Sequence, residues 1–220
     1  PQVDYSKGNN SKFAYATAPT QIINYVSCHD DYSLTDKLNV SMKGASEEEK
    51  MRAARLAQTI VFTSQGTPFM FAGEEVFRNK KGIHNTYNRP DSVNAIDWSL
   101  KDKNIDLFHY YQGLIALRKA HPAFALGSAE AVREHLSFID TDNEAAVGFV
   151  LDNLEGIDSA KRIVVLMNGS REAVEFAIPE GEYKWICDGE VVVPRGIGRY
   201  DAKDGKIAVA PISGIVLAAF

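Results

Sequence analysis

Cysteine is scarce in this sequence, which has only Cys28 and Cys187 among its 220 residues. The two residues fall in segments of different character, so the sequence does not predict a disulfide framework. Long apolar runs are missing as well, because no stretch reaches the roughly 20 residues that span a membrane. The chain opens at Pro1 with a polar stretch. These features predict no membrane partner and favour no particular compartment.

An excess of positive charge is also missing. The chain has 24 Lys and Arg against 29 Asp and Glu, a net charge of −5 and a pI of about 5.6. Proteins that bind nucleic acid or anionic membranes carry a basic patch or a basic overall charge. The sequence therefore predicts neither kind of partner and favours a neutral or small ligand.

The first half of the chain alternates between strand and helix patterns. Residues 22–27 form a short apolar run, typical of a strand that is buried on both faces of a parallel sheet. Ser46 precedes three glutamates, and the pair Ser46 and Glu49 predicts a capping box at the start of a helix. Apolar residues then recur at helical spacing until Gly66, where we expect the helix to have ended.

Two more elements complete this half. Residues 68–72 predict a second short strand, and residues 106–119 predict an amphipathic helix that Pro122 terminates. Two β/α units cannot form a covered sheet alone, whereas a (β/α)8 barrel uses eight strands in about 250 residues. We interpret residues 1–122 as the last two β/α units of a TIM (β/α)8 barrel, and expect a longer protein to carry the rest of the barrel upstream.

Beyond Pro122 the apolar pattern changes to a period of two. The expected strands are 136–141, 145–152, 162–168, 174–178, 183–187, 190–193, 206–210 and 214–220. Such short runs, separated by Gly-containing turns, are typical of an antiparallel β-sandwich. The sequence therefore predicts an α/β part followed by an all-β sandwich domain at 123–220.

Residues 28–31, "CHDD", place titratable groups at the end of the first expected strand. Adjacent side chains on a strand point to opposite faces, so Cys28 and His29 are poorly placed as nucleophile and base. His29, Asp30 and Asp31 offer metal ligands, but none of the other four histidines has a recognised ligand spacing. A structural alternative is that His29 and Asp30 only cap a loop. Their position favours function, because barrel active sites lie at the C-terminal ends of the strands.

Four motifs in order resemble the α-amylase superfamily in its pullulanase-type form. "INYVSCHDDYSLTDKL" looks like the fourth sequence region, where the seventh barrel strand ends in a His-Asp pair. "TSQGTPFMFAGEE" resembles the eighth strand, "NTYNRPDSVNAIDW" the loop after it in type I pullulanases, and "YYQGLIALRKAHPAF" the eighth helix. The likeness runs in register from about Pro1 to Phe220 and includes the all-β domain.

The resemblance implies a debranching glycoside hydrolase that cleaves α-1,6-glucosidic linkages in pullulan and branched α-glucans with retention. Retaining enzymes need a nucleophile and a general acid about 5 to 5.5 Å apart. The family takes both from strands that lie upstream of Pro1, so we expect this chain to be inactive alone. Asp30 matches the carboxylate that stabilises the transition state, and His29 its neighbour that holds the same sugar.

Further substrate contacts follow from the same resemblance. Asp31 stands where the family usually has Asn, which places an extra negative charge beside Asp30. Asn88 and Asp91 match positions that contact sugars, although "NRPD" is also a good turn sequence. Tyr25 is a candidate for the sugar platform. The family places no catalysis at "GEE", so Glu75 is expected to neutralise a basic group such as the run at 78–81.

Several residues have simpler structural interpretations. We expect the basic run 78–81 to be a solvated loop and Cys28 to be a small buried apolar residue. We assign the aromatic residues Trp98, Phe108, Tyr110, Tyr111 and Trp185 to core or interdomain packing.

Three alternatives stay open on the sequence alone. The parent protein is a pullulanase, or it is another α-glucan enzyme of isoamylase or neopullulanase type. In the third alternative, the chain is a non-catalytic carbohydrate-binding or structural module. The expected partners are an α-glucan and the upstream part of the barrel. No motif indicates a cofactor or metal; calcium, which some relatives bind, is left as an open alternative.

Overall fold

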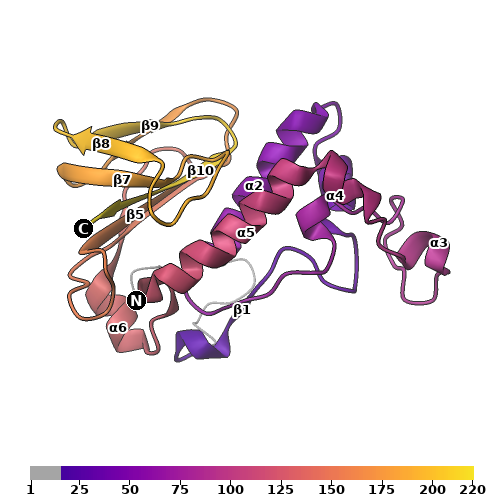
Figure 1. Cartoon of the computed structure of the whole chain (residues 1–220), viewed down its shortest axis with the longest axis horizontal. Coiled ribbons are helices and arrows are strands. Elements are labelled where there is room, and N and C mark those ends of the chain that lie inside the picture. The colour runs from indigo at the N-terminus through magenta and orange to yellow at the C-terminus, as the bar shows by residue number, and fades with distance from the viewer. Residues whose placement is uncertain (1–15) are drawn as a thin grey trace.

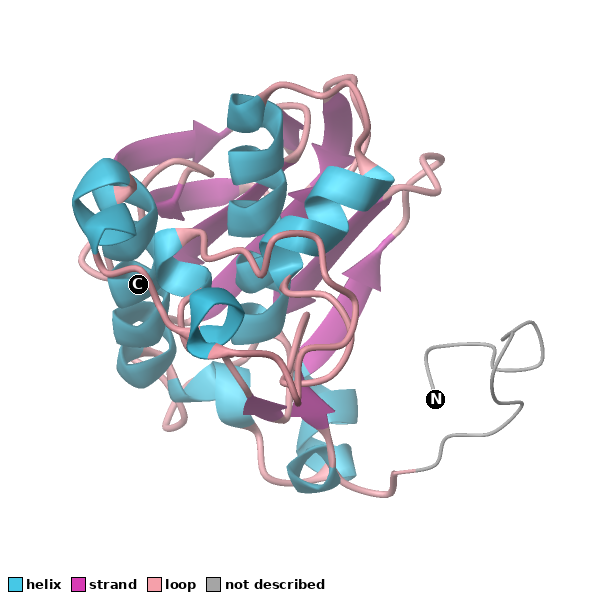
Figure 2. Cartoon of the chain, turned by 90° about the vertical axis from the view of Figure 1, so that its right-hand side faces the viewer, coloured by secondary structure: helices cyan, strands magenta, loops and turns pink. Residues whose placement is uncertain are grey.

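Two long helices lie side by side across one face of an antiparallel sheet (Figure 1). The computed structural model describes residues 16–220. Helices dominate as far as residue 135, and antiparallel strands follow from residue 136. The expected order of helical and all-β parts is confirmed, and Figure 2 shows helices in front of the strands. Among the described residues, no helix combines the length and apolar character needed to cross a membrane.

The two strands of the first half pair in parallel but are shorter than expected. They are β1 (Ile23–Asn24) and β2 (Thr67–Pro68). Backbone hydrogen bonds join Thr67 N to Ile22 O at 2.9 Å and Phe69 N to Asn24 O at 2.8 Å. In the described chain each strand has only the other as a neighbour. The predicted strands 22–27 and 68–72 are therefore wrong in length, because the ladder ends after two residue pairs.

The two predicted helices are confirmed as α2 (Glu47–Thr63) and α5 (Ile105–Ala120). Glu49 N donates to Ser46 Oγ at 3.1 Å, and Ser46 N donates to a Glu49 carboxylate oxygen at 2.9 Å, which completes the capping box. Several shorter helices and 3-10 turns were not predicted from the sequence. They are η2 (Pro19–Gln21), α1 (Leu34–Ser41), η3 (Glu74–Val76), α3 (Asp91–Asn94), α4 (Ser99–Lys103), η4 (Pro122–Ala125) and α6 (Ala129–His135).

The all-β part contains a larger and a smaller antiparallel sheet. The strands are β3 (Leu136–Ile139), β4 (Ala146–Leu151), β5 (Arg162–Asn168), β6 (Val174–Ala177), β7 (Gly181–Cys187), β8 (Gly198–Ala202), β9 (Lys206–Val209) and β10 (Ser213–Ala219). The larger sheet has the order β3-β4-β5-β10-β7-β8, and β6 pairs with β9 in the smaller one. The predicted antiparallel arrangement is confirmed.

The period-two pattern distributes side chains between two cores. On β5, Ile163 and Val165 join the cluster that includes α2 and α5 residues, whereas Val164 and Leu166 join the cluster beneath β6 and β9. The larger sheet is therefore covered on both faces, which explains why β5 is buried along almost its whole length. The first cluster contains residues from both sides of residue 122, among them Leu117 and Val216.

One expected strand does not form, and another was missed. Residues 190–193 make only an isolated bridge, Cys187 with Val192, whereas residues 198–202 form β8. Val193 N still donates to Ile186 O on β7 at 2.8 Å, and the backbone at 190–193 also lies against α5. A Cβ atom at Gly113 would be 2.6 Å from Val192 O, so only glycine allows this approach.

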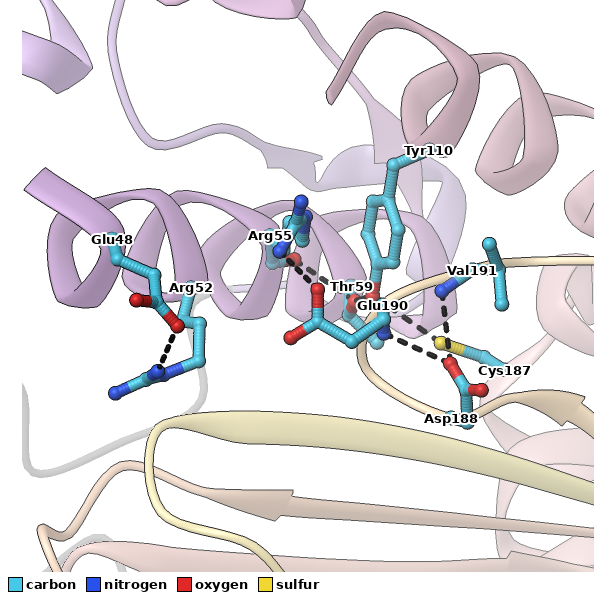
Figure 3. A network of polar contacts seen from close by, with 9 residues as sticks. All are labelled: Glu48, Arg52, Arg55, Thr59, Tyr110, Cys187, Asp188, Glu190 and Val191. Atoms are coloured by element: carbon cyan, nitrogen blue, oxygen red, sulfur yellow. Dashed lines mark hydrogen bonds and ion pairs between the residues drawn. The ribbon is translucent and has the colours of Figure 1, made fainter. Parts of the chain in front are cut away.

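A network of polar contacts joins α2, α5 and the loop after β7 (Figure 3). The Tyr110 hydroxyl lies 2.7 Å from Thr59 Oγ1 and 3.2 Å from Cys187 Sγ. Arg55 pairs with Glu190 on the outer side of the same network. Burial raises the pKa of the Cys187 thiol to about 11, so this cysteine stays protonated and packs as a core residue.

The aromatic residues only partly follow their expected packing. Tyr110 and Tyr111 are buried, and Trp185 packs edge-on against Tyr200 at a centroid distance of 5.6 Å beside the second core. Phe108 is only half-buried. The prediction that Trp98 packs in a core or between domains is wrong, because Trp98 is 60% exposed. Trp98 directly precedes α4, a short polar helix with no buried residue, so nothing there covers the ring.

Candidate functional site

The "HDD" triplet lies in the turn that follows β1. Ser27, just upstream, is buried, and its hydroxyl donates to the Glu74 carboxylate. The His29 and Asp30 side chains are then 79% and 65% exposed, with His29 Nε2 at 3.6 Å from Asp30 Oδ2. The turn therefore presents an imidazole and a carboxylate together at the surface. Cys28 is half-buried rather than buried, because it belongs to this turn and not to a strand.

Asp31 connects the triplet to the long loop after β2. Its backbone is left-handed, with φ at 58°, a conformation that Asp and Asn adopt more readily than most residues. Asp31 Oδ1 lies 2.9 Å from His84 Nε2, and the Tyr32 ring meets the His84 ring edge-on at 4.9 Å. The two loops that follow β1 and β2 thus meet at His84.

Asp36 fixes the position of the second loop. It lies in the first turn of α1, where Ser33 is the N-cap. Its buried carboxylate accepts hydrogen bonds from Ser33 Oγ at 2.6 Å, Lys80 N at 2.6 Å and Gly82 N at 2.8 Å. A carboxylate with three donors holds backbone segments firmly, because removing it leaves buried N–H groups without a partner. Asp36 therefore anchors the loop that carries His84.

The basic run at 78–81 is not a solvated loop. Arg78 and Lys80 are 7% and 4% exposed, so this prediction is wrong. Lys80 Nζ donates to Thr86 Oγ1 at 2.7 Å and lies 5.0 Å from the centre of the Phe71 ring. Arg78 donates to Ala72 O at 3.0 Å. Burial lowers the pKa of both side chains, because water no longer solvates their charges.

Asn88 and Asp91 lie on the far part of the same loop, and both are exposed. Asp91 begins α3. The turn there is held by another residue, Asn94, whose side-chain amide donates to Thr86 O and Arg89 O, each at 2.8 Å. In the described chain the Asn88 and Asp91 side chains make no hydrogen bond with protein groups, which leaves both available to a ligand. Their neighbour Tyr87 is 78% exposed.

Tyr25 follows β1, and Phe69 follows β2. The two rings pack edge-on with centroids 6.0 Å apart, and their residues are 54% and 42% exposed. Exposed aromatic faces of this kind can stack on apolar ligand surfaces. Tyr25 therefore has the exposure that a sugar platform requires.

The two glutamates after β2 differ in environment. Glu74 is buried and accepts a hydrogen bond from Gln58 Nε2 at 2.9 Å, in addition to the one from Ser27. Burial raises its pKa to about 7, although these hydrogen bonds oppose the shift. Glu75 accepts from Gly73 N at 2.8 Å, and its charge favours the protonated form of Arg78. That contribution agrees with the expected neutralising role.

Between residues 16 and 220, no three His, Cys, Asp or Glu side chains group closely enough to hold a metal ion. The arrangement instead offers exposed oxygen and nitrogen atoms beside aromatic rings. Such a surface can form hydrogen bonds with hydroxyl groups and stack against an apolar ring face.

Known proteins resemble this chain in sequence. Residues 132–191 match the family model described as "Pullulanase, all-beta domain". The pullulanase of Bacillus subtilis (strain 168) is 37% identical over 171 residues, which is 77% of this chain and 24% of that protein. Over most of its length, the chain is therefore similar to pullulanases.

Solved pullulanase structures share its fold. The pullulanase from Bacillus acidopullulyticus has a TM-score of 0.86 and 36% identity, covering 92% of this chain and 24% of that one. Pullulanase type I from Bacillus subtilis str. 168, complexed with maltose, has a TM-score of 0.87 and 32% identity, covering 98% and 30%. The chain thus spans between about a quarter and a third of the length of these pullulanases.

Within this chain, the structure brings together only part of the predicted site. His29, Asp30 and Asp31 share one turn, whereas Asn88 and Asp91 lie farther along the second loop and make no contact with them in the described part. His84 and Asp36 were not predicted as part of the site. The spacing of Ser33 and Asp36 is a capping pattern that could have revealed α1 and its anchor, but no local pattern identifies His84.

Proposed function

We propose that this chain is the C-terminal part of a debranching glycoside hydrolase. The parent enzyme hydrolyses α-1,6-glucosidic linkages in pullulan and branched α-glucans by a retaining mechanism. The observation that carries the proposal is the exposed His29–Asp30 pair at the end of β1, beside β2, in a chain that is similar to pullulanases over most of its length. The maltose bound to a pullulanase of the same fold supports an α-glucan as ligand.

The finer architecture belongs to the same proposal. Residues 1–122 are the last two β/α units of a TIM (β/α)8 barrel, and residues 123–220 are the all-β C-terminal domain. The parallel pairing of β1 with β2, with α1 and α2 between them, is the unit from which such a barrel is built. Residues 1–15, which fall in the proposed barrel part, lie outside the described residues.

In this scheme Asp30 stabilises positive charge on the sugar as the glycosidic bond breaks. A carboxylate can do this because the transition state has oxocarbenium character. His29 donates a hydrogen bond to the same sugar, and Tyr25, Asp31, Asn88 and Asp91 contact the glucan around it. The nucleophile and the general acid come from the upstream part of the barrel, the second partner of this chain. The chain alone is inactive.

The test is the release of reducing sugar from pullulan by the purified chain and by Asp30→Asn. Asp140→Asn is the matched control, because Asp140 is an exposed aspartate in the turn after β3. We expect no release from any of the three. Turnover that disappears only in Asp30→Asn would show that the chain holds its own catalytic pair and would overturn this division of roles.

A further inference from the structure

A buried carboxyl group lies directly behind the candidate site. Glu74, the first residue of η3, is 4% exposed. One of its oxygens accepts the hydroxyl hydrogen of Ser27, and the other accepts a hydrogen bond from Gln58 on α2. Ser27 stands two residues before His29 in the sequence. Glu74 is therefore connected to the turn of the site through one side-chain hydrogen bond.

The charges around Glu74 favour a proton on it. No Lys, Arg or His nitrogen in the described chain lies within 4.0 Å of its carboxylate oxygens. The titratable groups that face it are Glu75 on its own turn and Tyr111 on α5, while α2 contributes only the neutral Gln58. Burial and the nearby Glu75 charge raise the pKa of Glu74, and the hydrogen bonds only partly offset them.

We propose that Glu74 is a positioning residue for the site, and that its gain or loss of a proton moves the segment from Ser27 to Asp30. The description of this segment as a glucan site rests on the proposed function. The coupling between Glu74 and the segment rests on the contacts alone.

Protonation changes the hydrogen bonds that Glu74 can make. The ionised carboxylate only accepts, and Ser27 and Gln58 both donate to it. A protonated carboxyl group also donates, so either the Ser27 hydroxyl turns to accept or the Gln58 amide rotates to offer its oxygen. Gln58 Oε1 is buried and has no hydrogen-bond partner in the described chain, so it can take this role. A change in this hydrogen bond alters how Glu74 holds Ser27, the residue that continues into Cys28 and His29.

The experiment follows backbone amide resonances of residues 27–30 in the 220-residue chain by NMR between pH 5 and 9. Histidine is the side chain whose charge most readily changes near neutral pH. All variants therefore carry His29→Asn and His84→Asn, which removes the imidazoles in and beside the segment. The comparison is between this background, the background with Glu74→Gln, and the background with Glu75→Gln. Glu75 is the matched control because it is the adjacent carboxylate and makes no contact with Ser27.

We expect amide shifts of Cys28 and Asp30 with a midpoint of about pH 7, and their loss in Glu74→Gln. Glu75→Gln should keep the shifts with a lower midpoint, because the Glu75 charge raises the pKa of Glu74. If Glu74→Gln does not fold, Ser27→Ala provides the same test, because it removes the connecting hydroxyl while Glu74 still titrates. Shifts that persist in either of these two variants, or that are absent from the background, overturn the inference. Maltotetraose added to the unmodified chain at pH 6 and pH 8 separates the two proposals. Without binding, glucan recognition fails, whereas the coupling still stands.

Discussion

The buried imidazole of His121 lies 2.8 Å, Nδ1 to Oδ1, from the carboxylate of Asp158. His121 caps the end of α5, and Asp158 precedes β5, so the pair joins the two proposed domains. Asp158 also accepts hydrogen bonds from Ala160 N at 2.9 Å and Ala123 N at 3.2 Å. Burial tends to raise the pKa of Asp158, but these donors outweigh it, so its pKa lies below the usual value.

Replacing Asp158 with Ala should lower the free energy of unfolding by about 3 kcal/mol. The substitution leaves a buried imidazole N–H and two backbone N–H groups without their acceptor. Urea unfolding at pH 7, with Asp140→Asn as the control, measures the change. A loss below about 1 kcal/mol would show that the pair contributes little to the junction.

Acid should weaken the same contact. Because the folded-state pKa of Asp158 is lowered, its contribution is present above pH 3.8 and is lost as the pH falls through the lower folded value. Asp158→Asn should therefore flatten the acid limb of the stability curve, measured as Tm against pH below pH 4. An unchanged acid limb would contradict this assignment.

Glu74 should change stability with pH in the opposite direction to Asp158. Its pKa rises from 4.5 to about 7 on folding, so stability present below pH 4.5 is lost as the pH rises through 7. The loss reaches about 3 kcal/mol at most, since each pKa unit corresponds to about 1.4 kcal/mol. Glu74→Gln should remove this decline, and Glu75→Gln should keep it, in urea unfolding at pH 5, 6, 7 and 8. Equal slopes in both variants would rule out Glu74 as the source.

The network of Figure 3 contains a buried contact, at the Tyr110 hydroxyl, and an exposed one, between Arg55 and Glu190. Tyr110→Phe should cost about 1 to 2 kcal/mol, because Thr59 and Cys187 both lose a buried hydroxyl partner. Glu190→Gln should cost less than about 1 kcal/mol, because the Glu190 side chain is 59% exposed and its pair with Arg55 is screened by water. Thermal unfolding in low and high salt distinguishes the two substitutions. Only the loss of stability in Glu190→Gln should depend on salt.

Local patterns allow much of the fold to be predicted. The capping box of Ser46 and Glu49 lies within four residues, and the nearly continuous apolar run along 162–168 indicates burial on both faces of β5. The strand at 190–193 is predicted wrongly because its β-branched residues fit a regular strand as well as they fit the segment that is observed. Gly113, far away in the sequence, allows that segment to pack on α5 instead.

The site is predictable only where its residues are contiguous. The "HDD" triplet stands out because polar residues end an apolar run. The contact between Asp31 and His84, in contrast, depends on loops that Asp36 brings together from segments more than 40 residues apart. Burial of Arg78 and Lys80 has the same origin, because their partners are backbone carbonyls and a ring that only the folded loop supplies.

The central claim is that the glucan contacts of this chain lie on the two loops after β1 and β2. Titration of the isotope-labelled chain with maltotetraose, followed by backbone NMR shifts, tests it most directly. We predict shifts at residues 25–32 and 84–91, weakened in Asp30→Asn and unchanged in Asp140→Asn. Shifts confined to residues 136–219 would contradict the claim and would identify the β-sandwich as a separate carbohydrate-binding module.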